Sequence, residues 1–222
     1  MSAPQIRLPN STQRAAIIGR TGSGKTVQAF WLLSLSPFDK MPYTIIDYKG
    51  DELLNSTDRI KEIDFNDVPK HPGIYRLSPR ADENDKVEEW LWKVWQRENH
   101  GLFVDEGYML PDKNAFTAIL TQGRSKHIPV ICLTQRPSWI SRFVFSEADY
   151  YSVMHLNERN DRKRVQEFIP KDRHDIEKRL PNYHSYWYDV KNDHAAILGP
   201  VEDVASISER IHDALKPKRR IF

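Results

Sequence analysis

Residues 14–26 read RAAIIGRTGSGKT: an apolar run, a glycine-rich segment, and then a lysine and a threonine. The apolar run predicts a buried β-strand over Arg14–Gly19, and the pattern after the glycines predicts a helix over Lys25–Leu35 that ends before Pro37. Gly19–Thr26 satisfies the spacing G-x-x-x-x-G-K-[ST], which chance produces in about 1% of chains of this length. A strand before this motif and a helix after it are the context that a phosphate-binding loop requires.

The chemistry of a phosphate loop explains each of its positions. The glycines let the backbone curl so that its N–H groups converge on phosphate oxygens, and the following helix directs its positive end at the same anion. We expect Lys25 to reach the β- and γ-phosphates of ATP and Thr26 to place its hydroxyl on Mg²⁺. The alternative is a glycine-rich turn without a ligand. The predicted nucleotide-binding residues are Gly19, Arg20, Thr21, Gly22, Ser23, Gly24, Lys25, Thr26 and Val27.

Two acidic residues follow a second apolar run, GLFVDE over residues 101–106. A P-loop enzyme needs a strand that ends in a carboxylate beside the magnesium ion, and Asp105 fits that position. Glu106 is the candidate base that orients and deprotonates the attacking water. A Glu directly after the Asp favours ATP hydrolysis over simple nucleotide binding. The alternative is a solvated acidic turn.

A polar residue and an arginine lie near the next predicted strand, Pro129–Thr134. Gln135 follows that strand, and its amide can bond both water and the γ-phosphate; the alternative is an ordinary polar end of a strand. Arg124 precedes the strand and is our candidate for an arginine finger that completes a neighbouring subunit's site, which can raise the rate by about 10³–10⁵. Arg136 and Arg142 are the reserves, and the alternative for Arg124 is a surface salt bridge.

Short apolar runs alternate with longer helical patterns along the chain. This alternation predicts an α/β fold with a mostly parallel central sheet flanked by helices. We expect a core over residues 1–170 and a small C-terminal elaboration over 171–222, made of a hairpin, a helix and a basic tail. Further strands are predicted over Tyr43–Asp47, Gly73–Leu77 and Tyr151–Leu156. Further helices are predicted over Asp85–Glu98, Asn114–Gln122, Arg159–Phe168 and Val204–Leu215. The predicted hairpin pairs His184–Val190 with His194–Leu198.

Composition narrows the classes of function. The 222 residues are 39% hydrophobic and 29% charged, as in a globular protein, and the net charge of +2 means that any DNA contact must come from local patches. The single cysteine, Cys132, excludes an internal disulfide and predicts a buried strand thiol. No run approaches the roughly 18 apolar residues of a membrane span, and the first residues lack a secretory pattern. We therefore expect a cytoplasmic protein.

Four segments together resemble a known family. They are GRTGSGKT at 19–26, IIDYKG at 45–50, LFVDEGYML at 102–110, and the stretch 123–138, which ends in TQRPS. This set is similar to the FtsK/HerA superfamily of RecA-like DNA-pumping ATPases, and the resemblance covers residues 14–168. The absence of membrane segments, a long coiled coil and a winged-helix domain makes the chain most similar to the genome-packaging ATPases of icosahedral viruses with an internal membrane.

The resemblance implies a homo-oligomeric ring, a hexamer, with double-stranded DNA threaded through its pore. It implies that Gln135 senses the γ-phosphate, that an arginine acts across the subunit boundary, and that Asp47 and Lys49 lie near the nucleotide or the ring interface. Capsid or portal-vertex proteins are implied partners, with a location in the host cytoplasm or at a virion vertex. The candidates for gripping DNA are Arg136, Trp139, Arg142, Lys113, Lys126, the cluster Arg159, Arg162, Lys163 and Arg164, whose alternative is a solvated helix face, and the tail Lys216–Arg220.

The rival hypothesis is an assembly or secretion ATPase of the same fold, of the filamentous-phage extrusion type, that does not pump DNA. A GTPase would show the guanine-reading motif N-K-x-D, and an ABC-type ATPase would show L-S-G-G-Q. Both motifs are missing from the sequence.

Overall fold

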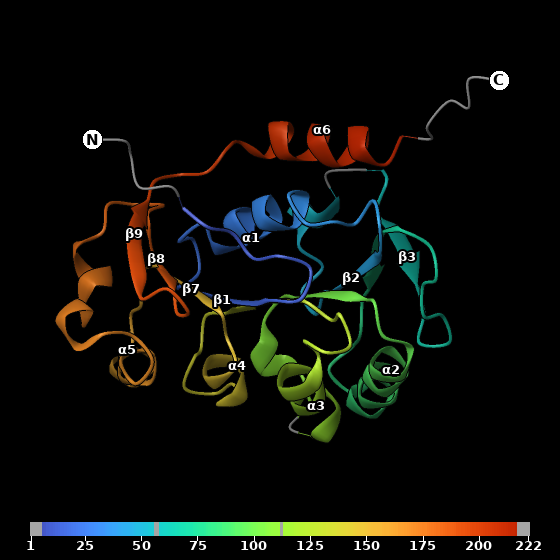
Figure 1. Ribbon diagram of the computed structural model, residues 1–222, viewed down its shortest axis with the longest axis horizontal. Coiled ribbons are helices and arrows are strands. Elements are labelled where there is room, and N and C mark those ends of the chain that lie inside the picture. The colour runs from blue at the N-terminus through green and yellow to red at the C-terminus, as the bar shows by residue number, and fades with distance from the viewer. Residues whose placement is uncertain (1–5, 56–57, 112, 217–222) are drawn as a thin grey trace.

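A single mixed sheet organises the chain. In the computed structural model, which describes residues 6–55, 58–111 and 113–216, nine strands lie in the order β3-β4-β2-β5-β6-β1-β7-β8-β9, with helices on both faces (Figure 1). The first seven strands pair in parallel, and the last two continue the sheet in antiparallel pairing. The predicted fold class is confirmed.

Most of the parallel strands are short and buried on both sides, as the apolar runs predict. Because they are parallel, all of their carboxyl ends lie at one edge of the sheet, where the following loops gather. Those loops include the glycine-rich segment, the acidic pair and Gln135. The strands are β1 Arg14–Ile18, β2 Pro42–Ile46, β3 Lys61–Ile63, β4 Gly73–Leu77, β5 Gly101–Val104, β6 Val130–Thr134 and β7 Tyr150–Val153.

Helices cover the two faces of the sheet unequally. Two helices lie on one face and pack against each other, α1 Lys25–Ser34 and α6 Val204–Ala214 (Figure 1). The opposite face carries α2 Asn84–Arg97, α3 Asn114–Gln122, α4 Phe143–Ser146 and α5 Arg159–Gln166. Short 3₁₀ turns are η1 Glu52–Asn55, η2 Gly107–Met109, η3 Lys171–Arg173 and η4 Ile176–Arg179. The predicted helices are confirmed within one or two residues, whereas β3, α4 and the 3₁₀ turns were not predicted.

Each face has its own apolar core. Beneath α2–α5 the largest buried side chain is Trp90, whose indole N–H donates to the carbonyl of Asp67 at 2.9 Å. Beneath α1 and α6 the core includes Phe30 and Trp187. Removal of a side chain such as Trp90 costs about 3–5 kcal/mol, because a cavity remains. Cys132 is buried in β6, as expected, and burial raises the pKa of its thiol.

The C-terminal hairpin extends the sheet instead of packing on it as a separate layer. Its strands are β8 Ser185–Asp189 and β9 His194–Leu198, and β8 pairs with β7 so that Ser152 lies opposite Trp187. This pairing brings the loop before β8 and the loop after β9 to the carboxyl edge of β7, beside the glycine-rich segment. A domain boundary at residue 170 stays a prediction. Of the predicted basic tail, Lys218, Arg219 and Arg220 lie outside the described residues.

None of the helices in the described ranges combines the length and apolar character that a membrane crossing requires.

Candidate active site

The glycine-rich segment forms a tight loop between β1 and α1. Gly22 and Gly24 have φ values of +77° and +92°, a left-handed region that a residue with a β-carbon rarely adopts. The N–H of Gly19 donates to the carbonyl of Thr134 at 3.2 Å, which fixes the loop beside the end of β6. Helix α1 begins at Lys25, so its free N–H groups and positive end face the loop. Ser23 Oγ is buried and has no hydrogen-bond partner among the described residues.

The acidic pair lies directly across from the loop. The N–H of Asp105 donates to the carbonyl of Ile46 at 3.0 Å and so continues the β2–β5 pairing by one residue. Glu106 then takes a left-handed conformation, φ 53° and ψ 60°, which ends the strand. Lys25 Nζ lies 3.4 Å from Glu106 Oε1, with the lysine side chain 7% and the glutamate side chain 0% exposed. The two motifs, 81 positions apart in sequence, therefore meet in one buried site.

The electrostatics of Asp105 suit a cation. Burial, followed by the neighbouring charge of Glu106, raises the pKa of Asp105 to about 6, against the opposing influence of Lys25 and Lys49. Asp105 Oδ1 and Glu106 Oε2 are buried and lack a hydrogen-bond partner among the described residues. Unpartnered carboxylate oxygens are the ligands that Mg²⁺ prefers, so this donor set fits the ion.

A third loop reaches the same site from β2. Asp47 is buried, and its Oδ1 accepts the backbone N–H groups of Lys49 and Gly50 at 3.1 and 2.8 Å. The turn that results, with Gly50 at φ +68°, directs Lys49 to an ion pair with Glu106. Although burial opposes it, the hydrogen bond and charge of Glu106 raise the pKa of Lys49. The sequence pattern D-x-K-G marked this turn, but nothing in it identified Glu106 as the partner of Lys49.

Gln135 contacts the phosphate loop, as its position after β6 predicts. Its side-chain oxygen accepts a hydrogen bond from the Thr21 hydroxyl, and its Nε2 donates to the Tyr108 hydroxyl at 3.2 Å. The amide therefore connects the loop after β1 with the turn that follows the acidic pair. Sequence reasoning did not single out Tyr108.

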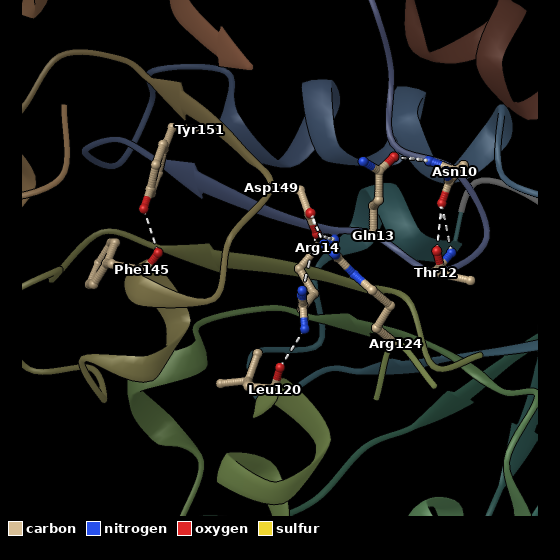
Figure 2. Close-up of polar contacts among 9 residues, drawn as sticks. All are labelled: Asn10, Thr12, Gln13, Arg14, Leu120, Arg124, Phe145, Asp149 and Tyr151. Atoms are coloured by element: carbon tan, nitrogen blue, oxygen red, sulfur yellow. Dashed lines mark hydrogen bonds and ion pairs between the residues drawn. The ribbon is translucent and has the colours of Figure 1, made fainter. Parts of the chain in front are cut away.

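Arg124 lies elsewhere. It forms an ion pair with Asp149, which precedes β7 at the amino edge of the sheet, opposite the edge that carries the phosphate loop. Figure 2 shows Asp149 beside both Arg124 and the buried Arg14, whose backbone N–H donates to Asp149 Oδ2 at 2.9 Å. The Arg124 side chain is 58% exposed. The chain therefore does not bring Arg124 to its own phosphate loop, and the action of Arg124 on a neighbouring subunit stays a prediction.

The candidates for gripping DNA are dispersed, and their role also stays a prediction. The Arg136 guanidinium lies 4.1 Å from the centre of the Trp139 ring and pairs with Glu158 and Asp161. Trp139 is 65% exposed. Five further candidates form ion pairs: Arg142 and Arg164 with Glu167, Lys113 with Asp85, Lys126 with Glu98, and Lys216 with Asp213. The cluster Arg159, Arg162, Lys163 and Arg164 lies on α5.

The strand order and the loop after β1 place the chain among the P-loop NTPases. Within that class it belongs to the family of viral DNA-packaging ATPases, since it is 38% identical to the DNA packaging ATPase P9 of Enterobacteria phage PRD1. The alignment is 225 positions long and covers 97% of this chain and 99% of that protein. The predicted resemblance is thereby confirmed. A scan against models of protein families found no match.

Solved structures agree on the fold. The genome packaging NTPase B204 from Sulfolobus turreted icosahedral virus 2, in complex with AMPPCP, superposes with a TM-score of 0.70 at 20% identity over 87% of this chain and all of that one. VirB4 of Thermoanaerobacter pseudethanolicus superposes with a TM-score of 0.60 at 12% identity, over 89% of this chain and 92% of the VirB4 chain.

Proposed function

We propose that this protein is a magnesium-dependent ATPase whose turnover drives double-stranded DNA into a viral capsid. The observation that carries the proposal is the buried contact between Lys25 of the phosphate loop and Glu106 after β5. It joins a cation suited to the β- and γ-phosphates with a carboxylate suited to the attacking water. The phage PRD1 relative is a DNA packaging ATPase, which supports the second half of the proposal, the movement of DNA into a capsid.

Each site residue then has a distinct task. Thr26 and Asp105 would hold Mg²⁺, and the bound ion would supply positive charge against the charge that develops on the phosphate. Lys25 holds the triphosphate and Glu106 accepts the proton of the attacking water. Gln135 sits where its amide can exchange the Thr21 hydroxyl for the γ-phosphate. Glu106 pairs with both Lys25 and Lys49, so a triphosphate that engages Lys25 would free part of the Glu106 carboxylate for the water.

A ring of identical subunits completes the proposal. Arg124 cannot serve its own site from the amino edge of the sheet, but it is exposed enough to serve a neighbour's. We infer a homo-oligomeric ring, a hexamer, around duplex DNA, with capsid or portal-vertex proteins as docking partners. The ring works in the host cytoplasm or at a virion vertex.

ATPase measurements with and without duplex DNA test the proposal. Lys25→Ala should abolish tight ATP binding, whereas Glu106→Gln should bind ATP and lose turnover by about 10²–10⁴-fold. Wild-type turnover in Glu106→Gln would show that the base is another group. A rate that duplex DNA leaves unchanged would instead favour the assembly or secretion ATPase.

A further inference from the structure

An apolar pocket lies beside the phosphate loop, on the side away from the acidic pair. It has a volume of about 140 Å³ and is lined by Gly24, Val27, Gln28, Met154, Tyr183 and residues 199–201. In the sheet, β1 has β6 and then β5 on one side and β7 and then β8 on the other. Asp105, Glu106 and Gln135 follow strands on the first side, and the pocket is built from loops on the second. An apolar cavity of about this size is large enough to hold an aromatic ring.

Tyr183 is the unusual member of the lining. The residue is 58% exposed, and its backbone has a φ of +61°, where a bulky residue is strained. A turn holds it there, because the N–H of His184 donates to the carbonyl of Pro181 at 3.2 Å and β8 begins at Ser185. The ring lies against the phosphate loop: a β-carbon added to Gly24 would be 3.1 Å from Tyr183 Cδ1. The chain thus holds a strained, exposed aromatic ring next to the last glycine of the loop.

The direction in which a triphosphate would lie on the loop indicates which part of ATP would reach the pocket. The γ-phosphate must lie towards Lys25 and Glu106, because the attacking water and the metal are handled there. The α-phosphate and ribose then leave the loop on its other side, past Gly24 and the first turn of α1. That path ends at the pocket. We propose that the pocket binds the base of ATP and that Tyr183 supplies the face on which the base stacks.

This inference rests on the proposed function and adds the mode of base recognition. The polar side chain in the lining, Gln28, already has partners: its amide donates to Ser185 Oγ at 2.9 Å and accepts from Ser152 Oγ at 2.6 Å. Gln28 therefore ties α1 to β7 and β8 and supports the pocket wall. Stacking and burial, instead of side-chain hydrogen bonds to the base edge, hold the base. The C-terminal segment thereby becomes part of the nucleotide site.

Binding measurements with two ligands test this assignment. Calorimetric titration with MgATP and with magnesium tripolyphosphate, which has no base, should separate the base from the phosphates. Tyr183→Ala is expected to weaken ATP binding about tenfold, as loss of a base–aromatic stack does. Tripolyphosphate binding should stay unchanged, and Tyr183→Phe should bind both ligands like wild type. Ile197→Ala is the matched control, because Ile197 is an exposed apolar residue of the hairpin that follows Tyr183 and does not line the pocket.

The outcomes distinguish this inference from the proposed function. Unchanged ATP binding in Tyr183→Ala, or equal losses for both ligands, would overturn base stacking. A wild-type protein that binds neither ligand would overturn the proposed function itself. Photolabelling of the wild-type chain with 8-azido-ATP gives evidence that needs no variant. Label at the peptides around residues 183 and 199–201, competed by ATP, supports the assignment, and label confined to the β5–β6 side refutes it.

Discussion

Asp105→Asn should stabilise the metal-free protein while abolishing its magnesium-dependent ATPase activity. Asp105 is 1% exposed, and one of its carboxylate oxygens has no partner among the described residues. Burial and the adjacent Glu106 raise its pKa from the ordinary value of 3.8 to about 6. Above pH 6 the folded chain therefore carries a charge that it would hold more easily when unfolded. Asparagine keeps the shape of the side chain and removes that charge.

The size of this stabilisation and its dependence on pH follow from the linkage between proton binding and folding. A folded-state pKa above the unfolded one means that stability falls as pH rises between the two values and is constant above them. The two pKa values imply a cost of about 3 kcal/mol at pH 7.5 and about 1 kcal/mol at pH 4.5, with one pKa unit worth about 1.4 kcal/mol. Asp105→Asn should remove most of this cost, so its advantage over wild type should shrink as pH falls.

Urea unfolding in EDTA at the two pH values measures the effect. Asp149→Asn is the control, because Asp149 is also buried but pairs with Arg14 and Arg124 at the opposite edge of the sheet. Breaking that buried pair should destabilise the fold by about 3 kcal/mol. The electrostatic argument for the cation site is refuted if Asp105→Asn destabilises the metal-free protein at pH 7.5. It is also refuted if the substitution raises the free energy of unfolding as much at pH 4.5 as at pH 7.5.

Three further expectations concern packing, assembly and DNA. Gly107→Ala should destabilise the fold by about 1–3 kcal/mol in urea unfolding, because its β-carbon would lie 2.5 Å from Cys132 Sγ and 2.6 Å from Ile140 Cδ1. Arg124→Ala mixed with Glu106→Gln should regain ATPase activity that neither variant has alone; activity no higher than in the separate variants would give no support to action in trans. If the protein grips the phosphates of duplex DNA, the logarithm of the association constant should fall linearly with the logarithm of the salt concentration in a filter-binding series. The constant should be the same for duplexes of scrambled sequence.

The sequence predicts which residues face the γ-phosphate side of the site, because their motifs are local and the strands that carry them are parallel. Each of the three predicted segments ends a buried strand, and parallel strands bring such ends to one edge. The partners within that edge are harder to predict. Lys49 and Glu106 are 57 positions apart, and only the turn held by Asp47 directs one to the other.

Elements without a periodic signal could not be predicted. Strand β3, Lys61–Ile63, is short and largely polar, and it exists because β4 offers a free edge on which Lys61 pairs opposite Tyr75. Helix α4 has four residues, too few for a helical period to appear. The strand expected over Tyr151–Leu156 instead ends at Val153, and soon afterwards the carbonyl of His155 accepts the N–H of Arg20 at 2.8 Å. That segment turns to support the phosphate loop instead of extending the sheet.

The two sides of the phosphate loop differ in what they demand of the sequence. Hydrolysis needs particular groups at particular atoms, so a lysine, a hydroxyl and two carboxylates leave a pattern that can be recognised. A base needs only a flat apolar surface of suitable size, which many residues can provide, so Tyr183 leaves no pattern. In the turn Pro181–His184, sequence preference would even assign the left-handed position to Asn182 and not to its neighbour Tyr183. Only the pairing of β8 with β7 places that tyrosine beside Gly24, and this contact between distant segments is why base recognition must be inferred from the structure.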